Sequence, residues 1–429
     1  MPLTRRAIVQ CVGIAAGCIP LALAAQNSAP RDIPHRVVTS PIAQSREPLG
    51  LNLGLKQMSD GRLLFNDAGR RRLLLFDSTL TTFTVIADTA PGARFKYGNG
   101  SVPLIPFLGD SSLFVDPASR SLLVLDNNGV VARIASVPKT SDFLRISSSR
   151  VHVDSKGRLL YRGPYPTRRP GPFGGPGVYV VKPADTAAIV RADFSSRTVD
   201  TLGSIKLNLL QWQQHTVRTG TLPLVEAIVS PVSYSDDWTV ASDGSIAILR
   251  GSDYHVDWIS PDGTKTSSPK MPFAWRRLTD DEKRRLADSV RVEEEKKLEA
   301  ELARLRVSRT GTARIARFNE LDGTSSTQSV AASILAAPPE DIPDYFPPIR
   351  QGALQPDRSG NVWILPFTAV RGDSSGLVYD VVNRRGELFQ RVELPPKRVL
   401  IGFGLRDTIY LTWQDSSDTW HLEAVRVKD

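Results

Sequence analysis

The sequence predicts an all-β fold built from small repeated antiparallel sheets, on three observations. One short phrase, a polar turn residue followed at once by strand-forming apolar residues, occurs six times along the 429 residues. Each copy leads to a second apolar run and a second turn. The number of residues between several of the copies is about the number that a small sheet contains. The six copies begin at Asp60, Asp110, Asp154, Asp243, Asp357 and Asp407.

The spacing of this phrase indicates a particular repeat architecture. Three of the intervals between copies are 44–50 residues long, and a four-stranded propeller blade takes about 40–50 residues. We therefore expect a six-bladed β-propeller of four-stranded antiparallel blades over 49–429. The long intervals 154–243 and 243–357 contain either hidden blades or insertions. Residues 205–235 lack the phrase, so we expect a long connection there and leave a seventh blade open.

Local residues support each hairpin. In the second unit, the apolar run 122–125 meets Asp126-Asn127-Asn128-Gly129 and is followed by another apolar run. Asn and Gly favour a tight hairpin there because both tolerate positive φ. In the last unit, 420–427 alternates apolar and polar residues, as a half-buried strand does. The Asp residues that open the phrases are interpreted as turn caps rather than as ligands.

One helix interrupts the β pattern. Thr279 and Glu282 stand at the positions of a capping box, which predicts a helical insertion over about 278–307. Its apolar stripe is broken, which favours a solvated helix resting one edge on the propeller, with a partner-binding or lid helix as the alternative. The segment 338–348, with a proline pair near each end, is expected to return as an extended chain.

The N-terminus has the layout of a signal peptide over 1–24. Arg5 and Arg6 precede an apolar, small-residue run that ends in an Ala-Leu-Ala cleavage site at Ala24. We expect an exported protein, periplasmic or secreted, with no transmembrane span after cleavage and a flexible lead-in over 25–48. The alternatives are a retained membrane helix and a lipid anchor at Cys18.

Composition excludes some function classes. The formal net charge of +9 is spread over scattered basic residues, without the continuous basic stripe that nucleic-acid binding needs, so no nucleic-acid partner is expected. Both cysteines, Cys11 and Cys18, lie inside the predicted signal. A chain cleaved at Ala24 has no thiol for catalysis, metal binding or disulfides.

One further pattern carries a family resemblance. The run Trp238-Thr239-Val240 is followed by Asp243-Gly244, then by Arg250 and Asp253-Tyr254, and then by a Pro-Asp-Gly turn. With the repeated phrase, this pattern resembles six-bladed β-propellers of the NHL and TolB-like type, above all exported bacterial ones of unassigned function. The resemblance implies a shared axis and a funnel lined by loops, where ligands tend to bind. It implies no particular activity.

The strongest local cluster of candidate ligand-binding residues lies between two strands of the fourth unit. Arg250, Asp253, Tyr254 and His255 offer a cation, a carboxylate, a hydroxyl and an imidazole. Such groups suit a small anionic or sugar-like ligand. The alternative is a decorated hairpin whose Arg and Asp residues pair locally.

Other candidate residues are more scattered. Trp238 suits either core packing or a stacking platform. Arg168 and Arg169 stand in a Pro/Gly-rich loop long enough to cover a funnel mouth. Trp275 and Arg276, just before the predicted helix, are a further exposed pair. The partner is accordingly either a small ligand of this kind or an unidentified protein.

Two functions follow as hypotheses. The first is an exported, non-catalytic module that binds a ligand or protein through its funnel loops, with no cofactor. The alternative is a metal-dependent propeller hydrolase or lyase with its site on the central axis, where calcium is the possible ion. The five histidines show no metal-ligand spacing, and the chain has no G-x-S-x-G or phosphate-binding glycine motif.

Overall fold

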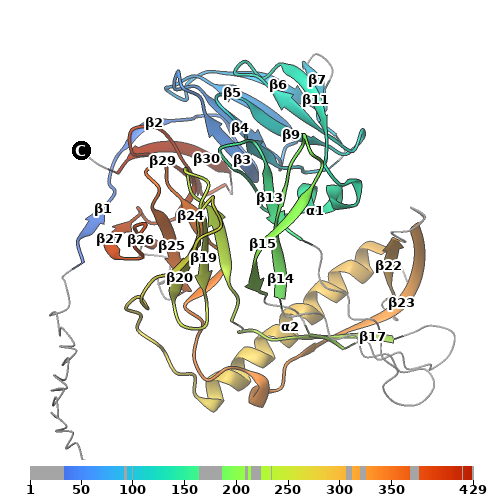
Figure 1. Ribbon diagram of the computed structural model, residues 1–429. Helices are drawn as coiled ribbons and strands as arrows, with labels where there is room; N and C mark the ends of the chain where they lie inside the picture. The colour runs from blue at the N-terminus through green and yellow to red at the C-terminus, as the bar shows by residue number, and fades with distance from the viewer. Residues whose placement is uncertain are drawn as a thin grey trace, which may run out of the picture. The chain divides into compact units, whose positions relative to one another are not determined.

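The computed structural model of the chain describes most of the predicted propeller (Figure 1). The described residues are 33–90, 94–98, 100–163, 186–207, 211–213, 224–232, 234–305, 312–318, 325–367, 376–417 and 419–427. The predicted signal peptide and the start of the lead-in lie outside them, as do Arg168 and Arg169. Those assignments stay predictions.

Six sheets carry the repeated phrase, and each contains a four-stranded antiparallel blade. The fold is therefore a six-bladed β-propeller, as the spacing predicts. The first blade also carries β7 (Phe95–Lys96) as a short parallel edge strand. The blades are β3 (Asn52–Gln57), β4 (Leu63–Asp67), β5 (Arg72–Phe76) and β6 (Phe83–Asp88); β8 (Leu104–Pro106), β9 (Ser112–Asp116), β10 (Ser121–Leu125) and β11 (Val131–Ser136); β12 (Val151–Val153), β13 (Leu159–Arg162), β14 (Thr186–Ala192) and β15 (Val199–Lys206); β18 (Asp237–Val240), β19 (Ile246–Arg250), β20 (His255–Ile259) and β21 (Lys265–Ser267); β24 (Ile349–Pro356), β25 (Val362–Pro366), β26 (Val378–Val382) and β27 (Leu388–Glu393); and β28 (Arg398–Phe403), β29 (Thr408–Gln414) and β30 (Trp420–Arg426) with β2 (Pro41–Gln44).

The repeated phrase forms the turn between the first and second strands of a blade. In the third blade, Asp154 Oδ1 accepts hydrogen bonds from the amides of Lys156 and Arg158, each at 3.0 Å, and Gly157 takes a φ of 78°. Asp357 does the same in the fifth blade, with the amides of the second and fourth residues after it. The turn-cap interpretation of these two residues is confirmed, because each carboxylate accepts two amides of its own turn beside the turn's backbone hydrogen bonds.

The first strands of the blades line the central axis. Neighbouring first strands contact one another in the pairs β3–β8, β8–β12, β12–β18, β18–β24 and β28–β3. Gln355 Nε2 on β24 donates to the carbonyl of Leu400 on β28 at 3.2 Å, which links the remaining pair. We call the end that carries the turns after the first strands the Asp-Gly end. The opposite end, where one blade connects to the next, is the connector end.

The ring is closed by the N-terminal segment. β2 pairs antiparallel with β30, so the outermost strand of the sixth blade comes from the start of the described chain. β1 (His35–Val37) pairs in parallel with β27 of the fifth blade. Within the expected lead-in, residues 35–37 and 41–44 thus form strands, because the outer edges of these two blades offer unpaired backbone groups.

A further four-stranded sheet lies outside the six blades. It contains β16 (Gln211–Gln213), β17 (Leu224–Val229), β22 (Thr312–Phe318) and β23 (Ser325–Ala336). Its strand order is β16-β17-β23-β22, and β17 runs parallel to β23. The strands come from the connections between blades three, four and five. The described strands within 211–229 therefore belong to this mixed sheet and do not form a seventh blade of consecutive antiparallel strands.

The predicted helix is α2 (Asp280–Leu305), and its capping box is present. Thr279 Oγ1 accepts a hydrogen bond from the amide of Glu282 at 3.3 Å, and Glu282 Oε2 accepts one from the amide of Thr279 at 2.9 Å. Leu286 and Ala287 pack on a small core at the base of the insertion. This core thus anchors the first turns of α2. That core consists of Val232, Leu278, Ala337, Ile342 and Phe346.

Short helical elements add to the single predicted insertion. η1 (Thr140–Asp142) and α1 (Phe143–Ser148) lie between the second and third blades. η2 (Pro339–Asp341) forms one tight turn inside the segment 338–348, which the sequence predicts to be extended. Prolines are compatible with the first positions of a helical turn because their missing amide is not needed there.

Candidate functional site

The predicted ligand-binding residues of the fourth blade lie at the connector end, and Arg250 is held there by its neighbours. Its Nη1 contacts Asp236 Oδ2 at 2.6 Å, and its Nε contacts Asp257 Oδ2 at 2.7 Å. Nη1 also donates to the carbonyl of Ser204 on the third blade at 3.0 Å. The Arg250–Asp257 pair is the local pairing that the alternative interpretation expects, and the bond to Ser204 also ties the third and fourth blades together.

The imidazole of His255 lies between two carboxylates. Its Nδ1 is 2.6 Å from Asp253 Oδ1, and its Nε2 is 3.2 Å from Asp257 Oδ1. Lys270 Nζ contacts the other oxygen of Asp253 at 3.3 Å. The polar groups of this loop are thus engaged mainly with one another.

Tyr254 has a buried structural contact. Its side chain is fully buried, and its hydroxyl donates to Asp380 Oδ2 on the fifth blade at 2.7 Å. Asp380 in turn pairs with Arg391 at 3.0 Å. Burial, with the neighbouring Asp380 carboxylate as the second cause, raises the pKa of Tyr254 well above its usual value. The phenol therefore joins two blades in its protonated form.

The remaining predicted residues lie apart from one another. Trp238 is buried on β18, where its ring lies 5.0 Å from that of His152. Trp275 is 40% exposed in the connection after the fourth blade, and Arg276 pairs with Glu282 of α2. The described residues thus place one predicted tryptophan in the core and one at the surface. A ligand-binding role for any of them stays a prediction.

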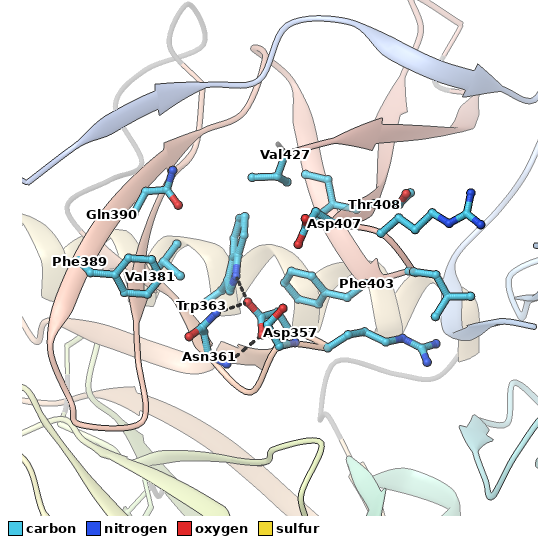
Figure 2. Close-up of a pocket in the computed structure, with 16 residues that line it drawn as sticks. Asp357, Asn361, Trp363, Val381, Phe389, Gln390, Phe403, Asp407, Thr408 and Val427 are labelled. Atoms are coloured by element: carbon cyan, nitrogen blue, oxygen red, sulfur yellow. Dashed lines mark hydrogen bonds between the residues drawn. The ribbon is translucent and has the colours of Figure 1, made fainter. Parts of the chain in front are cut away.

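A cavity lies at the opposite, Asp-Gly end, between the fifth and sixth blades. We call it the blade 5–6 cavity; its volume is about 280 Å³ (Figure 2). That is close to the lower limit of small-molecule sites, about 300 Å³. Its walls combine three aromatic side chains with polar and charged ones. The aromatic residues are Trp363, Phe389 and Phe403, and the polar and charged residues include Asp357, Arg358, Gln390, Arg406 and Asp407.

The floor of this cavity is built on the Asp357 turn. Asp357 Oδ1 accepts the amides of Ser359 and Asn361 at 2.9 and 2.8 Å. Its Oδ2 accepts Asn361 Nδ2 at 2.8 Å and Trp363 Nε1 at 3.2 Å (Figure 2). Four donors therefore hold this carboxylate. It orients the indole of Trp363 and has little capacity left for proton transfer or metal binding.

Two aromatic rings form the inner walls. Trp363 on β25 and Phe403 at the end of β28 have ring centroids 5.1 Å apart, with an interplanar angle of 66°. Phe389 on β27 is 40% exposed at the outer side of the cavity. These rings come from both blades, so the apolar walls exist only where the two blades pack together.

The second wall is an irregular turn. Arg406 and Asp407 take φ angles of 54° and 56°, where most of the other phrases place a glycine. Positive φ is costly for a side-chain-bearing residue and is often retained at functional positions. In Figure 2 the Asp407 side chain points into the cavity, toward the side of Trp363 and Phe403.

Positive charge gathers between this turn and the axis. Lys56 on β3 is 5% exposed, and its Nζ donates to three backbone carbonyls of the 107–111 turn at 2.5–2.6 Å. Burial, followed by the charge of Arg358, lowers the pKa of Lys56 to about 8. Arg358 Nη2 donates to the carbonyl of Gln57 at 3.4 Å. Both cations thus serve contacts between blades.

The sequence does not predict the blade 5–6 cavity. Asp357 is interpreted there as a turn cap, which is correct, but its bond to Trp363 joins positions six residues apart. Phe403 and Asp407 belong to another blade. The one available signal is that the sixth phrase lacks the glycine of the other turns and has Arg406-Asp407 at its centre.

Two general features of the described residues complete the site. No helix in the described ranges is both long enough and apolar enough to span a bilayer. Within those same ranges, no three His, Cys, Asp or Glu side chains gather in an arrangement suited to a metal ion.

Comparisons with known proteins give similarity at the level of the fold. No protein-family model matches the chain, and no curated protein matches it in sequence. Among solved structures, it is similar to a calcium-binding protein, regucalcin, from Agrobacterium tumefaciens (11% identity, 92% of this chain and 96% of that one, TM-score 0.38). It is also similar to virginiamycin B lyase from Staphylococcus aureus (10%, 90% and 98%, TM-score 0.36) and to a gluconolactonase from Xanthomonas campestris (12%, 92% and 95%, TM-score 0.34). Likeness this low does not identify an activity.

Proposed function

We propose that this chain is an exported, non-catalytic binding module that holds a small ligand in the blade 5–6 cavity. The observation that carries the proposal is a cavity of about 280 Å³ with aromatic walls from two blades and polar groups at fixed positions. Such a combination is typical of small-molecule sites, where apolar walls supply affinity and a few polar groups orient the ligand. The export part of the proposal rests on the N-terminal sequence alone.

The state of the polar groups favours binding over catalysis. The Asp357 carboxylate is occupied by four hydrogen-bond donors, and Lys56 is occupied by three carbonyls. A catalytic acid, base or nucleophile needs an accessible lone pair or proton. The metal-dependent hydrolase or lyase remains a separate prediction, tested by measuring the metal content of the purified protein.

The test is a ligand screen by thermal unfolding, with a cavity-filling variant. A ligand at one hundred times its dissociation constant stabilises the folded state by about 2.7 kcal/mol. We expect at least one small polar compound to raise the melting temperature of the natural protein. Ser359→Phe, which places a ring at the cavity wall, should abolish that rise.

The matched control is Lys156→Phe. Lys156 holds the same position in the third blade's turn that Ser359 holds in the fifth, and both side chains are exposed. This variant should keep the ligand-induced rise. Protection that persists in Ser359→Phe, or a screen in which no compound protects the natural protein, would contradict the proposal.

A further inference from the structure

Three side chains from three blades come together near the central axis at the Asp-Gly end. Lys56 lies on β3 of the first blade, Arg358 follows β24 of the fifth, and Tyr410 lies on β29 of the sixth. Arg358 interacts electrostatically with both of the others. Gln57 adjoins Arg358 and Tyr410, since a Cβ atom placed on Gly404 would meet both the Gln57 amide oxygen and the Tyr410 ring. We call Lys56, Arg358 and Tyr410 the axial cluster.

The axial cluster has hydrogen-bond donors that lack acceptors. Among the described residues, the Arg358 guanidinium makes one long bond, to the carbonyl of Gln57 at 3.4 Å, and no ion pair. Tyr410 is 2% exposed, and its hydroxyl has no hydrogen-bond partner in the same part of the chain. A buried hydroxyl without a partner costs free energy, so such a group indicates an acceptor supplied from outside the chain.

The axial cluster also has an excess of positive charge. Lys56 is almost fully buried, and the charge of Arg358 is the second cause, after burial, that lowers its pKa to about 8. The carboxylate that interacts with both cations is Asp110. Its oxygens accept hydrogen bonds from the amide of Ser59, at 2.8 Å, and from the Ser59 hydroxyl. One engaged carboxylate thus faces two cations, and a bound anion would relieve their mutual repulsion.

The turn of the fifth blade differs from that of the third in a way that leaves Arg358 unpaired. In the third blade, Asp154 Oδ2 contacts the Arg158 guanidinium at 2.7 Å. Asn361 takes the place of Arg158 in the fifth blade and donates to Asp357 Oδ2 at 2.8 Å. The turn carboxylate of the fifth blade is therefore satisfied by neutral donors, and the arginine of this turn is directed to the first blade instead.

We propose that the axial cluster binds a small oxyanion, a carboxylate or phosphate group, between the guanidinium of Arg358 and the hydroxyl of Tyr410. The planar fork of an arginine matches two oxygens of such a group, and the phenol supplies a further donor. Lys56, whose ammonium is occupied by three carbonyls, contributes charge behind the site. This inference goes beyond the proposed function, because Lys56 and Tyr410 do not line the blade 5–6 cavity.

The experiment measures the binding of inorganic phosphate and of acetate by isothermal titration calorimetry, at neutral pH and constant ionic strength. Chloride is the control anion, because it carries the charge but cannot match the arginine fork. We expect saturable binding of at least one oxyanion, about tenfold or more tighter than that of chloride. The oxyanion that binds more tightly identifies the head group as phosphate or carboxylate.

Variants of two residues connect the binding to the axial cluster. Arg358→Gln removes the charged fork and should weaken oxyanion binding about tenfold or more, whereas Arg358→Lys keeps the charge without the fork and should give an intermediate affinity. Tyr410→Phe removes a hydroxyl that has no partner in the chain. It should therefore not lower the melting temperature of the anion-free protein, but it should weaken binding about fivefold.

The matched control is Arg133→Gln, which removes an exposed positive charge from β11 of the second blade and should leave the affinity unchanged. An equal loss of affinity in Arg133→Gln and Arg358→Gln would show general charge attraction and overturn the site. The site is also refuted if neither oxyanion binds more tightly than chloride, or if binding persists unchanged in Arg358→Gln and Tyr410→Phe. Protection by a screened compound that is lost in Ser359→Phe is a separate result, so failure of the oxyanion site leaves the proposed function intact.

Discussion

At the scale of single residues, His152 makes stability depend on pH. Burial, with the Arg150 guanidinium as the second cause, lowers the pKa of His152 to about 3. An unfolded histidine titrates near 6.5. Between these values the unfolded state binds more protons, so the free energy of unfolding decreases as the pH falls from about 6.5 toward 3. At and above neutral pH this decrease in the free energy of unfolding is absent.

A single substitution tests this effect. The Nε2 atom of His152 is buried without a hydrogen-bond partner among the described residues, so His152→Leu should change the free energy of unfolding by less than about 1 kcal/mol at pH 7.5. At pH 5 the variant should be more stable than the natural protein. Urea unfolding at both pH values measures the difference. His35→Gln, whose imidazole is 49% exposed, is the control, and equal pH slopes in all three proteins would refute the assignment.

Residues with local roles could be read from the sequence, and residues with distant partners could not. The Asp154 and Asp357 carboxylates bond to amides within four residues, so the turn phrase alone reveals them. Tyr254 is different. Its hydroxyl bonds to Asp380, and nothing near Tyr254 in sequence distinguishes a ligand-binding phenol from one that joins two blades.

At the scale of elements, the capping box of α2 should contribute measurably to the insertion. Thr279→Ala removes the hydroxyl that accepts the Glu282 amide and should destabilise the first helical turn by about 1 kcal/mol. Hydrogen–deuterium exchange of the 280–284 amides measures the loss directly. Ser289→Ala, in the middle of the same helix, is the control and should leave those amides protected. Unchanged protection in Thr279→Ala would show that tertiary packing alone holds the turn.

The elements differed in how well the sequence predicted them. The helix and the hairpins depend on near neighbours in the chain, so their signals are local. The extra sheet could not be predicted, because its strands β17 and β23 are separated in the sequence by the whole fourth blade and α2. The blade 5–6 cavity was missed for the same reason, since its two aromatic walls come from β25 and β28.

At the scale of the whole molecule, two truncations test whether the N-terminal strands β1 and β2 stabilise the closed ring of blades. A deletion ending at residue 40 removes only β1, whereas one ending at residue 48 also removes the strand that completes the sixth blade. The longer deletion should lower the melting temperature further and promote self-association through the exposed edge of β30. Differential scanning calorimetry and light scattering measure both effects. Equal stability of the two truncated proteins would mean that β2 does not hold the ring together.

The pairing of β2 with β30 also sets an order of events during synthesis. β2 is among the first described strands to leave the ribosome, and its partner is the last. Nearly the whole polypeptide must therefore be available before β2 can pair with β30 and close the ring of blades. Contacts between residues so far apart in the sequence form slowly. Until β30 is available, the backbone groups of β2 have no partner strand. A chaperone would find its largest exposed binding surface at that stage.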